Sequence, residues 1–282
     1  MKTFLLFGAE GLFGTEFELC CHARGFDVIP LRRADCDITD QAQVEAAILG
    51  HRPDVVVNAA GMIDIDRCEM DPAGAFAVHC RAAIAMAEAA ERIGAIHVQT
   101  GTHLIFDGTA QRPYVESDLP APGTVYAATK LAAESLAAWR CSRNYSLRFP
   151  TLYGRRRNRH VGFVDRMVEM LSQGRTVRVA DDRIDTVTFA GDAAGTLLDL
   201  VIEERPWGIY HVANDQPQSY FDAINEINQL LGSPGTVLPA KDAEFRKSIA
   251  KPVRVPLASQ RIRPLRNWRD AMREYSTILK AA

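Results

Sequence analysis

Tyr126 and Lys130 lie four positions apart in a segment whose composition predicts a helix. At this spacing the two side chains share one helical face. An ammonium beside a phenol favours the phenolate, so Lys130 is expected to lower the pKa of Tyr126 toward neutrality, where a tyrosine can act as a general acid or base. The pattern Y-x-x-x-K also occurs on solvated helices, so the pair indicates a catalytic site only if other segments supply a cofactor and a substrate.

A glycine-rich turn near the N-terminus is the first such segment. Residues 3–7 are a short apolar run that predicts a strand, and residues 15–24 are compatible with a helix. Between them lie Gly8, Gly11 and Gly14. A strand, a glycine turn and a helix in this order are typical of a dinucleotide site, because the helix N-terminus offers N–H groups to a pyrophosphate. The alternative is a plain strand-to-helix turn.

Two arginines follow the second predicted strand, residues 27–31. An acidic residue here would bind the ribose 2′-hydroxyl of NAD, whereas Arg32 and Arg33 favour the 2′-phosphate of NADP(H). The alternative is a solvated basic loop.

Strands and helices continue to alternate along the first half of the chain. We expect a helix at 41–49 capped by Thr39 or Asp40, a strand at 54–57, a small-residue turn at 58–61, a long helix at 72–93 and a strand at 96–106. Right-handed crossovers then predict an α/β fold with a Rossmann-type, doubly wound parallel sheet. Ligands of such sheets bind at the carboxyl edge of the strands, where the polar residues 100–103 would lie.

Composition excludes several classes of function. The 282 residues carry a formal charge of -2 and have a pI near 6.4, which gives no overall attraction to nucleic acid or to an anionic membrane. No apolar run reaches the roughly 18 residues of a membrane span, and the N-terminal apolar run is too short for a signal peptide. The six cysteines have no metal-binding spacing, so we expect no metal site and free thiols in a cytoplasmic protein.

Motifs spread over nearly the whole chain resemble the extended short-chain dehydrogenase/reductases, and most of all their dTDP-4-dehydrorhamnose reductase (RmlD-like) branch. In the first half they are the glycine turn, Asp37-Ile38, Asn58-Ala59-Ala60, residues 101–108 and the Tyr126/Lys130 pair. In the second half they are residues 148–154, residues 182–192 and residues 266–275.

This resemblance implies two domains with different binding roles. Residues 1–150 would bind NADP(H), and residues 151–282 would mainly form a smaller α/β substrate-binding lid, with some segments returning to the first domain. The implied cofactor-binding residues are Gly8, Glu10, Gly11, Leu12, Phe13, Gly14, Arg32, Arg33, Asp37, Ile38, Ala59, Ala60, Gly61, Thr100, Tyr126 and Lys130.

The implied catalytic set is Thr102, Tyr126 and Lys130. Tyr126 would protonate the carbonyl oxygen of the substrate, Thr102 would donate a second hydrogen bond, and Lys130 would hold the nicotinamide ribose. The implied reaction is NADPH-dependent reduction of a nucleotide-linked 4-keto-6-deoxysugar in deoxysugar biosynthesis. A homodimer is one expected oligomeric state.

Departures from the branch concern the substrate. His103 stands where the branch usually has aspartate, Thr151 where it often has tryptophan, and His79 where relatives carry asparagine. His103 is interpreted as a pocket wall rather than a second acid, since nothing in the sequence pairs it with a carboxylate. The basic run 155–160 suits a diphosphate through Arg155 and Arg157, or else is a solvated loop.

Three other functions stay open at this point. A nucleotide-sugar epimerase or dehydratase would restore its cofactor in each cycle, so net NADPH consumption separates it from a reductase. A reductase of a non-sugar carbonyl is compatible with Thr151 and His103. A non-catalytic, NADP-binding regulatory subunit would not need Thr102, Tyr126 and Lys130 together.

Overall fold

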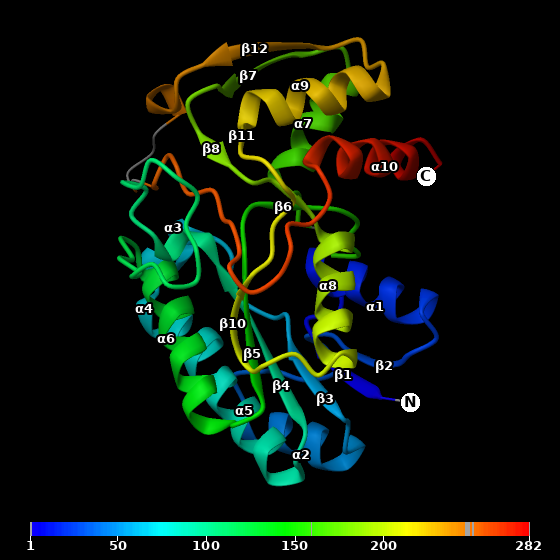
Figure 1. Ribbon diagram of the computed structural model, residues 1–282, viewed down its shortest axis with the longest axis vertical. Coiled ribbons are helices and arrows are strands. Elements are labelled where there is room, and N and C mark those ends of the chain that lie inside the picture. The colour runs from blue at the N-terminus through cyan, green and yellow to red at the C-terminus, as the bar shows by residue number, and fades with distance from the viewer. Residues whose placement is uncertain (1, 159, 246–248, 250, 282) are drawn as a thin grey trace.

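A sheet of six parallel strands forms the centre of the computed structural model, which describes residues 2–158, 160–245, 249 and 251–281 (Figure 1). The strands lie in the order β10-β5-β4-β3-β1-β2. Their bounds are β1 Thr3–Phe7, β2 Asp27–Leu31, β3 Val55–Asn58, β4 Ile96–Thr102, β5 Asn144–Phe149 and β10 Gly208–His211. The predicted doubly wound parallel sheet is confirmed, and its last strand comes from the second half of the chain.

Alternation along the strands explains why both faces of the sheet are covered. In β1, Phe4 and Leu6 pack on one face, whereas Leu5 and Phe7 pack on the other. Helices α1 (Leu12–Ala23) and α8 (Ala190–Ile202) cover the first face. Helices α2 (Gln41–His51), α5 (Ala82–Ile93) and α6 (Val125–Arg140) cover the second.

A smaller region lies beyond the carboxyl ends of the strands (Figure 1). It contains the strand pairs β6 (Leu152–Tyr153) with β9 (Thr188–Phe189), β7 (Thr176–Ala180) with β12 (Thr236–Ala240), and β8 (Ile184–Asp185) with β11 (Gln218–Ser219). Helices α7 (Phe163–Ser172), α9 (Tyr220–Leu231) and α10 (Trp268–Ala281) enclose a separate apolar core with these strands. Within the described part of the chain, no helix is long and apolar enough to cross a membrane.

Two predicted boundaries are wrong, and one predicted helix contains a π-helical turn. Helix α1 begins at Leu12 rather than Thr15, so that Gly14 lies inside the helix. Strand β4 ends at Thr102 rather than Phe106, because the Thr102 hydroxyl accepts from the Leu104 amide and starts a 3-10 turn, His103–Ile105. The helix predicted at 72–93 has these bounds in the structure, but a π-helical turn (Ala77–Arg81) separates α4 (Pro72–Phe76) from α5.

Candidate active site

Thr102 and Tyr126 meet at the carboxyl end of β4. Thr102 is the last residue of that strand, and its side chain is hydrogen-bonded to Tyr126. Tyr126 lies in the first turn of α6, which begins at Val125 because the side chains of Thr124 and Glu69 accept from the amides at the helix N-terminus. A strand end and a capped helix therefore bring a hydroxyl and a phenol together.

Lys130 occupies the next turn of α6 and is buried. Its ammonium donates to the carbonyl oxygen of Thr100 over 2.6 Å, and the Thr100 hydroxyl donates to the Asn58 carbonyl at 2.9 Å. These bonds fix Lys130 between the ends of β4 and β3.

Burial has the largest effect on the pKa values of Tyr126 and Lys130. It raises the pKa of Tyr126 to about 12, against the opposing effect of the Thr102 hydrogen bond. Burial lowers the pKa of Lys130 to about 8, and the neighbouring Glu134 opposes that shift. The predicted lowering of the Tyr126 pKa toward neutrality is therefore wrong for this state of the protein, since desolvation of the phenolate dominates. Tyr126 is a neutral phenol that can donate a proton.

His79 packs its ring edge-on against the ring of Tyr126, with the ring centroids 5.7 Å apart. Burial, followed by the charge of Lys130, lowers the pKa of His79 to about 3, so the imidazole is neutral. Its Nδ1 lies 2.8 Å from the Thr129 hydroxyl, which itself donates to a helix carbonyl, and its Nε2 accepts from the Met62 amide at 3.1 Å. The neutral ring thus supports Tyr126 from the π-helical turn.

A buried ion pair that the sequence did not indicate lies one turn beyond Lys130. Glu134 accepts two hydrogen bonds from Arg148 of β5, at 2.6 and 2.9 Å, and both residues are almost fully buried. Arg148 also donates to Nε2 of His211 at 3.3 Å. Glu134 lies four positions after Lys130, so the sequence could have placed it on the same helical face, but no sequence pattern pointed to Arg148.

The glycine turn at the end of β1 fits a dinucleotide. Gly8 has a φ of +83°, and a Cβ there would lie 2.7 Å from the backbone of Ala59. Gly14 packs against the Gly8 carbonyl, where a Cβ would lie 2.2 Å from the oxygen. Helix α1 starts with no side-chain cap and no acidic residue in its first turn, which leaves its first amides available to an anion.

The other predicted cofactor residues lie along the same edge of the sheet with different degrees of exposure. Arg32 and Arg33 are exposed after β2, and Gly61 is exposed after β3. The half-buried residues are Glu10, Leu12, Asp37, Ile38, Ala59 and Ala60. Phe13 is buried and packs on Phe149, with ring centroids 4.8 Å apart, so its side chain belongs to the core.

The predicted substrate residues His103 and Thr151 join the sheet to the smaller region. His103 follows Thr102 and is buried, and its Nε2 lies 3.3 Å from a carboxylate oxygen of Asp185. The sequence indicated no carboxylate partner for His103, but β8 brings Asp185 to it from 82 positions away. Thr151 is half-buried, and its hydroxyl lies 2.6 Å from that of Tyr220.

The basic run after Gly154 binds carboxylates within the protein. Arg155 forms a bidentate pair with the buried Glu16 of α1, and Arg157 pairs with Glu18 of the same helix. Arg156 pairs with Asp165 of α7. Arg159 lies outside the described residues. Neither alternative drawn from the sequence included these pairs, which attach the loop to the helix that follows the glycine turn.

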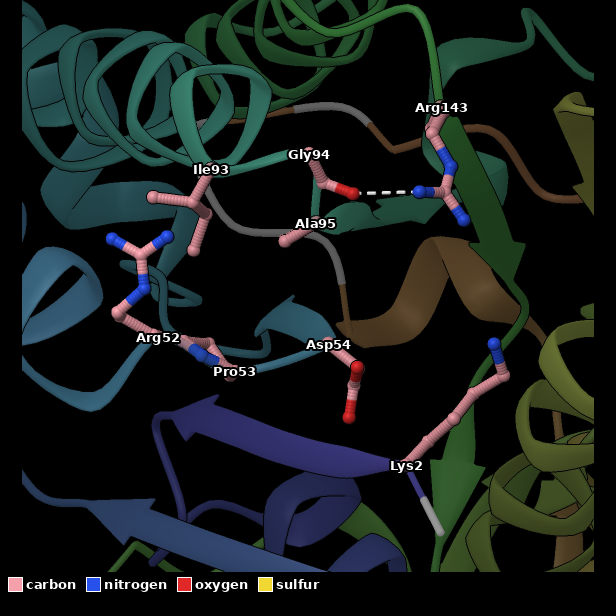
Figure 2. A pocket seen from close by; sticks show the side chains of 8 residues that line it. All are labelled: Lys2, Arg52, Pro53, Asp54, Ile93, Gly94, Ala95 and Arg143. Carbon is pink, nitrogen blue, oxygen red and sulfur yellow. Dashed lines mark hydrogen bonds between the residues drawn. The ribbon is translucent and has the colours of Figure 1, made fainter.

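A polar pocket lies at the opposite edge of the sheet, where the strands begin (Figure 2). Lys2, Arg52, Asp54 and Arg143 line it, and Figure 2 shows the Arg143 guanidinium directed to the carbonyl oxygen of Gly94, a contact of 2.6 Å. It is remote from the Thr102–Tyr126 pair, which lies at the carboxyl ends of the strands.

Comparison with known proteins agrees with this arrangement. The sequence model of the RmlD substrate binding domain matches residues 1–280. A dTDP-4-dehydrorhamnose reductase of Streptomyces griseus is 34% identical over 281 residues, which cover 96% of this chain and 91% of the relative. A probable dTDP-4,6-dihydroxy-2-methyloxan-3-one 4-ketoreductase of Streptomyces antibioticus is 32% identical over 287 residues, covering 99% and 96%.

The fold is also that of solved structures. The crystal structure of a dTDP-4-dehydrorhamnose reductase from Bacillus anthracis, in complex with NADP, superposes with a TM-score of 0.92 at 23% identity and covers 98% of this chain and 99% of that one. The resemblance drawn from the motifs is confirmed. The chain belongs to the RmlD family of the extended short-chain dehydrogenase/reductases, a family of NAD(P)-dependent reductases.

Proposed function

We propose that this protein uses NADPH to reduce the 4-keto group of a dTDP-linked 4-keto-6-deoxysugar to a hydroxyl. The observation that carries the proposal is the hydrogen-bonded Thr102–Tyr126 pair, with Lys130 one turn along the helix, at the sheet edge that also carries the glycine turn. The related 4-keto reductases from Streptomyces support the substrate class.

In this proposal, residues of the protein donate the proton to the substrate and orient the substrate and the cofactor. Tyr126, neutral because burial raises its pKa, donates its phenolic proton to the oxygen that gains charge as the carbonyl is reduced. Thr102 donates a second hydrogen bond to that oxygen, and Lys130 binds the nicotinamide ribose. When bound, NADPH supplies the hydride that reaches the carbonyl carbon.

The proposed preference for NADP(H) rests on Arg32 and Arg33. Both are exposed at the end of β2, where an arginine side chain can bind a 2′-phosphate with two parallel hydrogen bonds. The NADP bound in the Bacillus anthracis structure supports the same preference. In this proposal residues 1–150 bind the cofactor and residues 151–282 mainly bind the sugar nucleotide.

The test is reduction of dTDP-4-dehydrorhamnose by the purified protein, followed as loss of NADPH absorbance. Tyr126→Phe is expected to abolish turnover and keep NADPH binding, because only the phenolic hydroxyl, and with it the proton donor, is removed. Tyr145→Phe is the matched control, since its hydroxyl bonds the carbonyls of Leu200 and Arg205 at the far end of β5. Full activity in Tyr126→Phe rejects the assignment, and turnover of the sugar without net NADPH loss indicates an epimerase or dehydratase instead.

A further inference from the structure

We propose that His103 and Asp185 form a positioning pair for the proposed reduction, holding the substrate-binding region against the strand end that carries Thr102. The inference rests on the proposed function. In this proposal the His103–Asp185 pair fixes the position of the Thr151 hydroxyl relative to Thr102 and Tyr126. The pair therefore contributes to recognition of the sugar.

Both ring nitrogens of His103 are used inside the protein. Nδ1 lies 3.1 Å from the carbonyl oxygen of Phe149, and Nε2 lies 3.3 Å from Oδ2 of Asp185. A carbonyl oxygen and a carboxylate oxygen both accept hydrogen bonds, so each ring nitrogen of His103 faces an acceptor. His103 therefore joins two segments of the protein and has no nitrogen left to bind a substrate.

Asp185, the partner of His103, is held as a carboxylate. It is 1% exposed, and burial alone would raise its pKa. The charge of His103 and hydrogen bonds from His103, Thr151 and Thr186 reverse that effect and lower the pKa. The amides of Thr151 and Thr186 donate to it at 3.1 and 2.8 Å, respectively.

The pair thereby fixes Thr151 from two sides. Asp185 binds the Thr151 amide, and His103 binds the carbonyl of Phe149, two residues before it. The Thr151 hydroxyl lies 2.6 Å from that of Tyr220, whose ring lies under the guanidinium of Arg183, 5.7 Å from the ring centroid. The hydroxyls of Thr151 and Tyr220 form a half-buried polar group that could hydrogen-bond to the hydroxyls of a deoxysugar. The His103–Asp185 pair sets the position of this group.

The test compares kinetic constants of His103→Gln, Asp185→Asn and the double variant, with NADPH and dTDP-4-dehydrorhamnose as probes. Each single variant is expected to raise the KM for the sugar by about tenfold or more and to change the KM for NADPH less than about twofold, because the cofactor edge is untouched. The double variant is expected to raise this KM by less than the product of the two single effects, since both changes break the His103–Asp185 contact.

Two further variants complete the test. Thr151→Val removes the positioned hydroxyl and leaves the pair intact, so it is expected to raise the same KM even if the pair variants fold poorly. Asp199→Asn, which breaks the exposed pair with Arg24, is the matched control and is expected to change neither KM.

An unchanged KM for the sugar in Asp185→Asn or Thr151→Val, with wild-type turnover established, overturns the inference alone. A wild-type protein that reduces none of the 4-keto-6-deoxysugar nucleotides overturns the proposed function, and the inference with it.

Discussion

Replacing Glu134 by Gln removes the charge of one partner from the buried pair with Arg148. Glu134 and Arg148 are 4% and 2% exposed, and their two hydrogen bonds measure 2.6 and 2.9 Å. A buried guanidinium left without its carboxylate costs about 3–5 kcal/mol of stability, and we expect the lower end because the Gln oxygen can still accept one bond.

The expected change in melting temperature follows from the length of the chain. An unfolding entropy of roughly 2 cal/mol/K per residue gives about 0.6 kcal/mol/K for 282 residues, so the loss corresponds to a fall in Tm of about 5–8 °C. Differential scanning calorimetry of the purified variant measures it. The double variant Glu134→Gln/Arg148→Met is expected to recover much of the loss, because no unpaired charge remains buried.

The same change acts on Lys130. Glu134 raises the pKa of Lys130 against burial, which lowers it to about 8, so Glu134→Gln lowers that pKa further. A smaller fraction of Lys130 is then charged at pH 8, and the alkaline limb of the kcat/KM profile moves to lower pH. A Tm change no larger than that of the surface variant Asp199→Asn, together with an unmoved alkaline limb, refutes the reasoning.

Three other outcomes are expected. His79→Asn loses less stability than wild type between pH 7 and pH 4, because burial lowers the pKa of His79 to about 3 and the unfolded chain takes up a proton below about 6.5 that the folded protein excludes; equal Tm-versus-pH slopes would contradict this. Arg155→Ala/Arg157→Ala lowers Tm, since Glu16 and Glu18 lose their partners, and leaves the KM for the sugar nucleotide unchanged; a raised, salt-sensitive KM would instead support diphosphate binding. Arg32→Ala/Arg33→Ala raises the KM for NADPH by about tenfold and leaves that for NADH unchanged; parallel changes in both would exclude a 2′-phosphate contact.

The parallel sheet and the place of the glycine turn could be predicted because both depend on local patterns. Short apolar runs, such as 3–7 and 55–57, alternate with helical segments in the first half of the chain, and few topologies satisfy that order. The sequence indicated the Tyr126/Lys130 pair and the polar residues 100–103 for a related reason, since an i,i+4 spacing and a strand end can be read directly. The catalytic role of Thr102 was implied by the family resemblance and stays a prediction.

Contacts between distant segments could not be read in the same way. Three ion pairs form only through tertiary packing: Asp185 with His103, Glu16 with Arg155, and Glu134 with Arg148. Such contacts leave no periodic pattern in the sequence from which they could be predicted. The direction of the Tyr126 pKa was missed for a similar reason. The i,i+4 spacing shows that Lys130 is near, whereas the desolvation that dominates depends on every element packed around the phenol.

The positions of α8 and β10 late in the chain affect how the protein folds during synthesis. When a ribosome has made the first 150 residues, β5 still has an unpaired edge, because β10 lies at 208–211, and α8, which covers part of one sheet face, has not been made. An open strand edge beside bare apolar surface pairs readily with other chains. We therefore expect the nascent protein to be prone to aggregation until about 60 further residues have emerged, and residues 1–150 expressed alone to aggregate.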